Sequence, residues 1–461
     1  LWDSHLAASG SNGEHKMKWF LAALLLLLAA LLLESSLLAY AMYVLLGLLL
    51  LTRWLARSWI GSLSATRTCK QLTANIGDRV AVQLTVTNDG GLPVPWVLAE
   101  DLLPQSALGQ RFPRLKIKGK RLQIAMLRGG ATLEMKYHIE CLMRGYFQIG
   151  PLTLESGDLF GLHRRFRVLT EATFLLVYPR IVPLLGYDIA SRRPIGDVRL
   201  THRLYEDPTR IAGVRPYEAG DPLNRVHWRA TARTGALHSK IHEPSTLSGA
   251  TVLLDFHEAG YLRQGEPFRS ELAVTTAVSL ANAVYEMGQQ VGLATNGRDA
   301  VDRIKTEGWE QDPRTRQAAR GTAAMSQENE RLQPLLVETR RGVEQLHRIR
   351  ETLARVERTD GMTFAELVIE TIGRLPRDAT ILAVLPDVSV ETAISLGNLR
   401  RSGLAIAVVL ILLDDEPLER AYGRLVAEGI RDIRHLKSEE ELPELCRRQV
   451  DRSSPYTFIV S

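Results

Sequence analysis

The run Ala250-Thr-Val-Leu-Leu-Asp-Phe256 is almost wholly apolar, and the same composition returns in Thr380-Ile-Leu-Ala-Val-Leu385 and Leu404-Ala-Ile-Ala-Val-Val-Leu-Ile-Leu-Leu413. A strand carries apolar residues on both faces when helices cover both sides of a parallel sheet. Amphipathic helices are expected around these runs at 269–287, 343–357, 364–375, 390–401 and 418–428, with further strands at 291–295 and 456–460. The pattern predicts a doubly wound α/β domain over residues 249–461, with a polar, non-periodic insertion near 297–334.

Residues 66–180 show a different pattern, with short alternating runs separated by turn residues. The run 80–87 alternates and is followed by Asn-Asp-Gly-Gly, and further strands are expected at 132–140, 146–149, 152–155 and 174–178. Pro93, Pro95, Pro104 and Pro113 are expected in connections or edge strands, because proline cannot donate to a β-ladder. The region therefore predicts a small β-sandwich domain.

Two uncharged runs near the start, 19–33 and 37–51, are separated only by Glu34 and two serines. Each is shorter than the roughly 20 residues that span a bilayer. One helix over both would be about 50 Å long and would place Glu34 near the bilayer centre. A transmembrane helical hairpin over residues 17–57 is therefore favoured over a single helix, a signal peptide or a buried soluble hairpin.

Basic residues flank both ends of this hairpin. Lys16 and Lys18 precede its two apolar runs, and the basic residues that follow these runs are Arg53, Arg57, Arg67 and Lys70. The positive-inside rule therefore places both ends in the cytoplasm. The sequence thus predicts a multi-pass protein of the cytoplasmic (inner) membrane with its soluble domains in the cytoplasm. Residues 1–16 are polar and precede Met17; they are set aside as a tail that need not be native.

Composition excludes some classes of function. The 461 residues are 45% hydrophobic and 24% charged, as in a globular protein, and the net charge of +5 is too small to indicate nucleic-acid binding. Cys69, Cys141 and Cys446 are far apart and form no CxxC pair, so neither a disulfide framework nor a zinc cluster is predicted.

The densest group of chemically active side chains lies in residues 213–243, the junction between the two predicted soluble domains. It holds Arg215, Arg225, Arg229, Arg233, Lys240, His227, His238 and His242, with Glu218, Asp221 and Glu243 as counterions. The histidines lack the helical spacing of a metal site. A basic run of this kind binds phosphate or nucleic acid in other proteins, but the acidic neighbours argue against it. The favoured interpretation is structural, with Asp221, Arg225 and Trp228 clamping the junction by ion pairs and stacking.

A second group lies at strand ends, where doubly wound sheets bind ligands. Asp255 ends the first apolar strand and Asp387 follows a later one. Magnesium prefers hard oxygen ligands, which His257 and Ala259 do not supply, so Asp255 is expected to cap a loop or helix, and no metal or cofactor is predicted. The P-loop, GxSxG, HExxH and strand-following GxGxxG patterns are also missing from the sequence.

The residues of the junction resemble the central motif of the domain-of-unknown-function-58 family, bacterial and archaeal membrane-anchored proteins with a von Willebrand factor A-like domain. The matching positions are Gly213, Arg215, Tyr217, Gly220, Asp221, Arg225, His227, Trp228, Ala232, Arg233 and Gly235. A second segment, 144–151 with 158–161, is similar to the family's RGxYxLGP and DPFG elements, with Leu159 where proline is usual. The likeness extends from about Met17 to the C-terminus.

This resemblance implies a von Willebrand factor A-like fold for residues 249–461. Its metal-binding loop has the pattern D-x-S-x-S, and Asp255 aligns with the first position, whereas His257 and Ala259 stand in place of the serines. The metal site is therefore expected to be degenerate. The family resemblance further implies a MoxR-type AAA+ ATPase as partner, in systems that mature or assemble other proteins.

Two functions follow as hypotheses. The first is a membrane-tethered, non-enzymatic interaction or scaffold protein whose α/β domain docks an ATPase or client. The second is a ligand-binding or hydrolytic protein that uses Asp255, His257 and Asp387. Nucleic-acid binding by the basic run is the least favoured interpretation.

Overall fold

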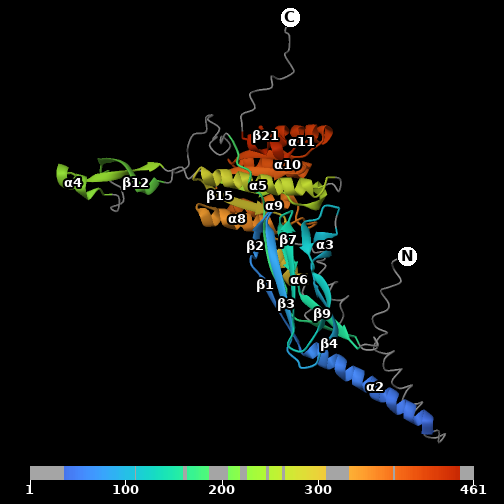
Figure 1. Cartoon of the computed structure of the whole chain (residues 1–461). Coiled ribbons are helices and arrows are strands. Elements are labelled where there is room, and N and C mark those ends of the chain that lie inside the picture. Colours follow the sequence, from blue (N-terminus) through green and yellow to red (C-terminus); the bar gives the residue numbers. More distant parts are fainter. Residues whose placement is uncertain are drawn as a thin grey trace. The chain divides into compact units, whose positions relative to one another are not determined.

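A computed structural model of the chain describes residues 36–109, 111–158, 164–185, 206–218, 226–244, 249–261, 265–307, 332–376 and 379–446 (Figure 1). These residues form two compact units. The first comprises the described residues up to Leu142 and those within Phe147–Leu175, and the second comprises Met143–Tyr146 and the described residues from Leu176 onward. Each unit is considered by itself.

The first unit begins with helix α2 (Ser36–Gly61), whose apolar side chains lie largely exposed. Its segment Tyr40–Gly61 is 22 residues long with a mean hydropathy of 1.3 in its most apolar window, and by length and composition it is able to cross a membrane. Among the described residues it is the one helix with this property. The first apolar run, 19–33, lies outside the described residues, so the predicted two-helix hairpin is tested on its second arm alone.

Helix α2 runs past the predicted end at residue 57 and stops at Gly61, and strand β1 begins at Leu63. Arg167 stabilises this junction, because its Nη1 donates to the carbonyls of Ile60, Gly61 and Leu63 at 3.1, 3.2 and 3.3 Å. The last carbonyls of a helix have no partner within the helix. Arg167 therefore caps α2 and ties it to the sheets that follow.

Three sheets follow α2 in this part of the chain, in the orders β1-β3-β7-β5, β10-β9-β4-β6 and β2-β11-β8. Both four-stranded sheets are antiparallel. The elements are β1 (Leu63–Cys69), β2 (Thr73–Asn75), β3 (Arg79–Asn88), β4 (Val94–Asp101), α3 (Gln105–Leu108), β5 (Leu115–Gly119), β6 (Leu122–Leu127), β7 (Thr132–Cys141), β8 (Gly145–Ile149), β9 (Leu152–Gly157), β10 (Arg164–Val168) and β11 (Thr173–Tyr178). The strands predicted at 80–87, 132–140, 146–149, 152–155 and 174–178 are confirmed as β3, β7, β8, β9 and β11.

Asp101 joins the two four-stranded sheets across their buried faces. Its Oδ2 accepts a 2.6 Å hydrogen bond from the Tyr137 hydroxyl of β7, and its other oxygen pairs with Arg67 of β1. Burial raises the pKa of Asp101, and the Arg67 guanidinium opposes that rise. Pro95 departs from its predicted place, since it lies in the inner strand β4; the ladder to β6 is irregular between Val94 and Val97, which accommodates the missing donor.

The second unit contains a six-stranded sheet in the order β17-β15-β14-β19-β20-β21. All neighbouring strands are parallel except the edge strand β17, which is antiparallel to β15. The elements are β14 (Gly249–Leu254), α5 (Phe268–Glu286), β15 (Gln290–Thr295), β16 (Arg298–Asp299), α6 (Ala300–Glu307), β17 (Leu335–Arg340), α8 (Val343–Arg355), β18 (Val356–Glu357), α9 (Phe364–Thr371), β19 (Ala379–Leu385), α10 (Val390–Arg401), β20 (Ala405–Ile411), α11 (Asp415–Ala427) and β21 (Asp432–Leu436), with short 3-10 turns at Glu258–Gly260, Ile372–Arg374 and Glu439–Glu444. The predicted mostly parallel sheet is confirmed.

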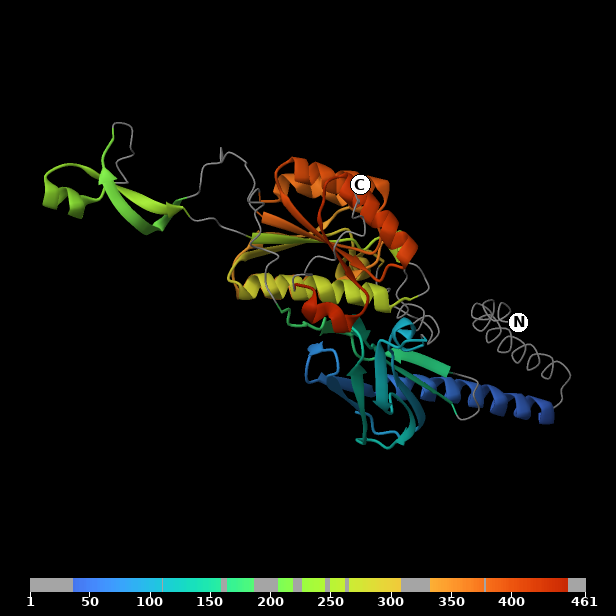
Figure 2. The same ribbon diagram turned by 90° about the horizontal axis from the view of Figure 1, so that it is seen from above.

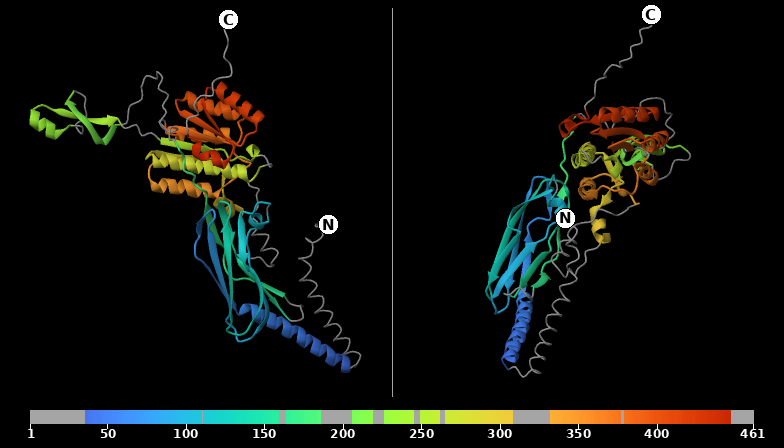
Figure 3. Two further views of the ribbon diagram at one scale, coloured as in Figure 1. Left: turned by 45° about the horizontal axis from the view of Figure 1, so that its top comes forward. Right: turned by 90° about the vertical axis from the view of Figure 1, so that its right-hand side faces the viewer.

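Helices cover both faces of this sheet (Figures 2 and 3). One core cluster packs α5 and α8 against one face, and a second packs α9, α10 and α11 against the other. Strands β14 and β19 are buried along their whole length, which explains why their sequences are apolar at successive positions. The third predicted apolar strand appears as β20.

Several elements differ from the sequence-based expectation. The edge strands β17 and β21 were not predicted, because their residues are only partly buried and include charged side chains. The first residues of the expected insertion form β16 and α6, whereas the rest of that insertion and the strand expected at 456–460 lie outside the described residues.

Gly292 of β15 is required by the close approach of β17. A Cβ added to it would lie 2.3 Å from Thr339 Oγ1 and 3.0 Å from Thr339 Cα, and the Thr339 hydroxyl is itself held by Thr251 at 2.8 Å. We expect Gly292→Ala to destabilise the protein by about 1–3 kcal/mol and to increase hydrogen exchange in β17. Gly423→Ala on α11 is the matched control, since nothing lies within 4 Å of its added Cβ; equal behaviour of the two variants would contradict the expectation.

Candidate functional site

The junction motif lies on a β-hairpin, β12 (Glu206–Pro216) and β13 (His238–Pro244), connected through the short helix α4 (Trp228–Thr234). The two strands are antiparallel, with Gly213 opposite Ile241 and Arg215 opposite Ser239. The sequence pattern does not predict this hairpin, because its strands mix charged and apolar residues without a regular alternation.

Two motif residues determine the ends of α4. His227 is the N-cap, and its Nδ1 accepts a 3.0 Å hydrogen bond from the Ala230 amide. Gly235 is the C-cap with φ of 73°, a left-handed conformation that glycine adopts without strain. His227 also donates its backbone amide to the His238 carbonyl at 2.8 Å, so α4 is held against β13.

The remaining motif residues are distributed along the hairpin. Gly213 and Arg215 lie on β12, Tyr217 follows it, and Arg233 lies in the last turn of α4. Trp228 is 68% exposed at the start of α4. The clamp of Asp221, Arg225 and Trp228 stays a prediction, because two of its three members lie outside the described residues. Gly220, Asp221 and Arg225 lie outside the described residues, as does the His242 side chain.

The two described histidine rings are used within the hairpin. His227 caps α4, as above, and His238 Nδ1 lies 2.8 Å from the Ala236 carbonyl and 3.2 Å from Thr234 Oγ1. These contacts are local and join the helix to the strand. Within the described part of the chain, no group of three or more His, Cys, Asp or Glu side chains is arranged to hold a metal ion.

We expect His227→Ala to lose about 0.5–2 kcal/mol of local stability in α4, because the Ala230 amide loses its acceptor. Hydrogen–deuterium exchange of the α4 amides measures the loss. His227→Asn is the control, since asparagine is a strong N-cap residue and should preserve protection. If both variants exchange at the wild-type rate, the cap does not stabilise α4.

The second predicted group lies at the carboxyl edge of the parallel sheet. Asp255 directly follows β14 and is 7% exposed. Its Oδ1 accepts hydrogen bonds from the His257 amide at 3.1 Å and from Asn296 Nδ2 at 2.9 Å. Asn296 also accepts from the Phe256 amide at 2.6 Å and donates to the Met362 carbonyl at 3.0 Å. Asp255 thus hydrogen-bonds the loops that follow β14 and β15.

His257 and Asp387 also make local contacts. His257 Nδ1 accepts from the Ala259 amide at 3.2 Å and caps the short turn that begins at Glu258. Asp387 Oδ1 accepts from the Val388 amide at 2.8 Å, and its side chain is exposed. Asp255 and Asp387 influence each other electrostatically, so the structure brings the two strand-end carboxylates to one edge.

Sequence reasoning missed two polar residues around this edge. Asn296 follows β15 just as Asp255 follows β14, so the same strand-end rule would have found it. Arg269 is buried and donates to the carbonyls of Pro386 and Ile411 at 2.5 and 3.2 Å, where β19 and β20 end. Arg269 lies inside a predicted helix, so the strand-end rule does not identify it.

Arg144 begins the segment 144–151 that is similar to the RGxYxLGP element, and the sequence predicts none of its contacts. In the second unit its buried guanidinium donates to the carbonyls of Leu353 and Val356 at 2.9 and 2.8 Å. It also pairs with Glu271 at 3.3 Å and lies 5.5 Å from the centre of the Phe256 ring. Arg144 therefore links the end of α8 to α5 and to the residue that follows Asp255.

Burial raises the pKa of the Asp255 carboxyl, against the opposing hydrogen bond from Asn296. The stability that Asp255 contributes is thus fully present below about pH 4, its unfolded pKa, and is lost as the pH rises through the folded pKa. We expect Asp255→Asn to unfold at higher urea concentration than wild type near pH 7, with the difference shrinking toward pH 4.

Urea titration of the detergent-solubilised chain, followed by circular dichroism at several pH values, measures this difference. Glu370→Gln removes one carboxylate charge from an exposed position on α9 and serves as the control. A pH-independent effect of Asp255→Asn would contradict the expectation.

Comparison with known proteins finds a family model that begins within β12 of the hairpin and extends into the α/β unit. Residues 213–320 match the family model described as "Protein of unknown function DUF58". The chain is also 24% identical over 261 residues to the "Uncharacterized protein YeaD" of Bacillus subtilis (strain 168), a match that covers 56% of this chain and 62% of that protein's length.

Two of the solved structures that resemble this chain each cover a quarter of it. The CARDB domain of the PF1109 protein from Pyrococcus furiosus is 11% identical with a TM-score of 0.18, covering 25% of this chain and 86% of that domain. A β-glucosidase from Listeria innocua is 10% identical with a TM-score of 0.18, covering 25% of this chain and 16% of the enzyme. Similarities at this level support no inference about function.

Proposed function

We propose that this chain is a membrane-anchored DUF58 protein that binds a protein partner through the hairpin β12–α4–β13 and acts as a scaffold without catalysis of its own. The observation that carries the proposal is the exposure of Trp228. An exposed tryptophan leaves a large apolar surface in water, and buried tryptophans are frequent centres of protein–protein interfaces. The family-model match, which begins at Gly213, supports the same segment.

The neighbouring residues support an interface as well. Arg229 and Arg233 are exposed on α4 beside Trp228, and arginine joins tryptophan among the side chains that dominate binding energy. The caps His227 and Gly235 hold α4 in a defined shape, which lowers the entropy lost on binding.

The membrane anchor is proposed as the two-helix hairpin predicted from sequence, with residues 19–33 as its first arm. The exposed apolar surface of α2 supports the second arm. Arg53 and Arg57 follow the apolar part of α2, and burial together with these two charges lowers the pKa of Arg165 of β10. This basic group at the end of α2 supports a cytoplasmic location for the soluble units.

The α/β unit is proposed to be von Willebrand factor A-like, on the basis of the parallel sheet and the position of Asp255 after β14. From the resemblance of its motif, the partner is proposed to be a MoxR-type AAA+ ATPase, with no nucleic acid bound.

The alternative, a ligand-binding or hydrolytic protein using Asp255, His257 and Asp387, has one observation in its favour: these three groups meet at one sheet edge.

Capture of the partner tests the proposal. The full chain is solubilised in mild detergent from its native membranes, recovered by a C-terminal tag, and analysed by mass spectrometry with and without ATP. We expect an AAA+ ATPase with the wild type and with Trp228→Phe, and at least tenfold less with Trp228→Ala, because alanine removes the interfacial apolar surface.

Ile369→Ala is the control, since Ile369 is an equally exposed apolar side chain on α9, at 67%. Undiminished ATPase capture by Trp228→Ala would reject the hairpin as the binding site. Failure of the wild type to capture any ATPase, together with saturable heat on titration with a divalent cation or nucleotide, would favour the alternative.

A further inference from the structure

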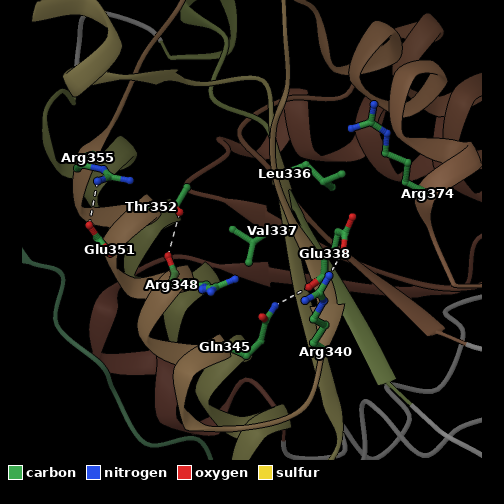
Figure 4. Close-up of a pocket in the computed structure, with 10 residues that line it drawn as sticks. All are labelled: Leu336, Val337, Glu338, Arg340, Gln345, Arg348, Glu351, Thr352, Arg355 and Arg374. Carbon is green, nitrogen blue, oxygen red and sulfur yellow. Dashed lines mark hydrogen bonds and ion pairs between the residues drawn. The ribbon is translucent and has the colours of Figure 1, made fainter. Parts of the chain in front are cut away.

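A groove of about 370 Å³ lies along the open edge of the parallel sheet (Figure 4). Edge strand β17 contributes one wall and helix α8 another, and Arg374 reaches it from the turn after α9. The lining residues are Leu336, Val337, Glu338, Arg340, Gln345, Arg348, Glu351, Thr352, Arg355 and Arg374. Neither the hairpin motif nor the strand-end residues take part in it.

The strand that lines the groove has an unpaired side. Among the described strands, β17 pairs with β15 alone and ends the sheet order. An edge strand presents a row of amides and carbonyls that a further strand can pair with. Close packing on the inner side, through Gly292 and the Thr251–Thr339 hydrogen bond, fixes β17 in position. The outer row is thus held in place by the sheet itself.

The groove is also basic. Four arginines line it against two glutamates, and both glutamates already have partners. Glu338 pairs with Arg340 at 2.6 Å and Glu351 with Arg355 at 2.9 Å. In the described part of the chain no carboxylate pairs with Arg348 or Arg374. Two guanidinium groups therefore face the groove with their charge uncompensated by the residues described.

We propose that this groove binds an extended, acidic segment of a partner protein, which adds a strand to β17 and places its carboxylates beside Arg348 and Arg374. The unpaired side of β17 and the uncompensated arginine charge together favour this occupant. A small anion would satisfy the guanidinium groups but leave the outer row of β17 unpaired, and an uncharged strand would do the reverse. The site is separate from the hairpin and does not rest on its proposed role.

A fluorescein-labelled nonapeptide of alternating threonine and glutamate is the probe, and its anisotropy is measured with the detergent-solubilised full chain. We expect saturable binding that weakens with salt, and none by the lysine-containing analogue. Arg348→Ser/Arg374→Ser should weaken binding by about tenfold or more, since each carboxylate loses a charged donor. Arg164→Ser/Arg420→Ser is the matched control, because it removes the same charge from exposed arginines elsewhere.

Two N-methylated versions of the peptide test for strand addition. One is methylated at the threonine amides and the other at the glutamate amides. Alternate amides of a strand point in opposite directions, so exactly one version should lose binding. Equal binding by both, full competition by millimolar phosphate, or unchanged affinity in Arg348→Ser/Arg374→Ser would overturn the proposal. Trp228→Ala should bind the peptide as the wild type does, which separates this test from that of the hairpin.

Discussion

A strand that is buried on both faces can present charged side chains to solvent only where it ends. Strands β14 and β19 are buried along their whole length, and this constraint determines where the α/β unit places its chemistry. Asp255, Asn296 and Asp387 all follow strands at the carboxyl edge. The other place where polar groups can gather is the lateral edge, where β17 has a neighbour on one side in the described sheet. The polar groups of this unit therefore gather at the carboxyl edge of the sheet and at the β17 edge, because its central strands are buried.

The carboxyl edge is occupied by the protein's own hydrogen bonds. Asn296 bridges the loops that follow β14 and β15, and Arg269 holds the carbonyls at the ends of β19 and β20. Such bonds satisfy buried polar groups that would otherwise be costly. They also leave Asp255 with a structural role in the loop that follows β14. The hairpin and the β17 groove, by contrast, present exposed or unpaired side chains on which the two proposals rest.

The central strands β14, β19 and β20 could be predicted because each is an apolar run of strand length. The edge strands β17 and β21 could not, since partial exposure allows charged residues that remove the apolar signal. The hairpin was missed for a related reason: its strands mix charged and apolar residues, so most cross-strand pairs join a polar residue to a non-polar one. Arg144 shows a different limit, because its acceptor Leu353 lies 209 residues away, and no local pattern encodes such a contact. Asn296, by contrast, was accessible to the rule that identified Asp255.

Only Ser62 separates the end of helix α2 from strand β1. Arg167 donates hydrogen bonds to three carbonyls on the two sides of Ser62, and the Ser62 hydroxyl donates to Asn88 Oδ1 at 3.1 Å. The first unit thus has no slack between its apolar helix and its sheets. A change in the tilt or rotation of α2 therefore also moves β1 and the strands that pair with it, because no flexible linker lies between the helix and the sheet.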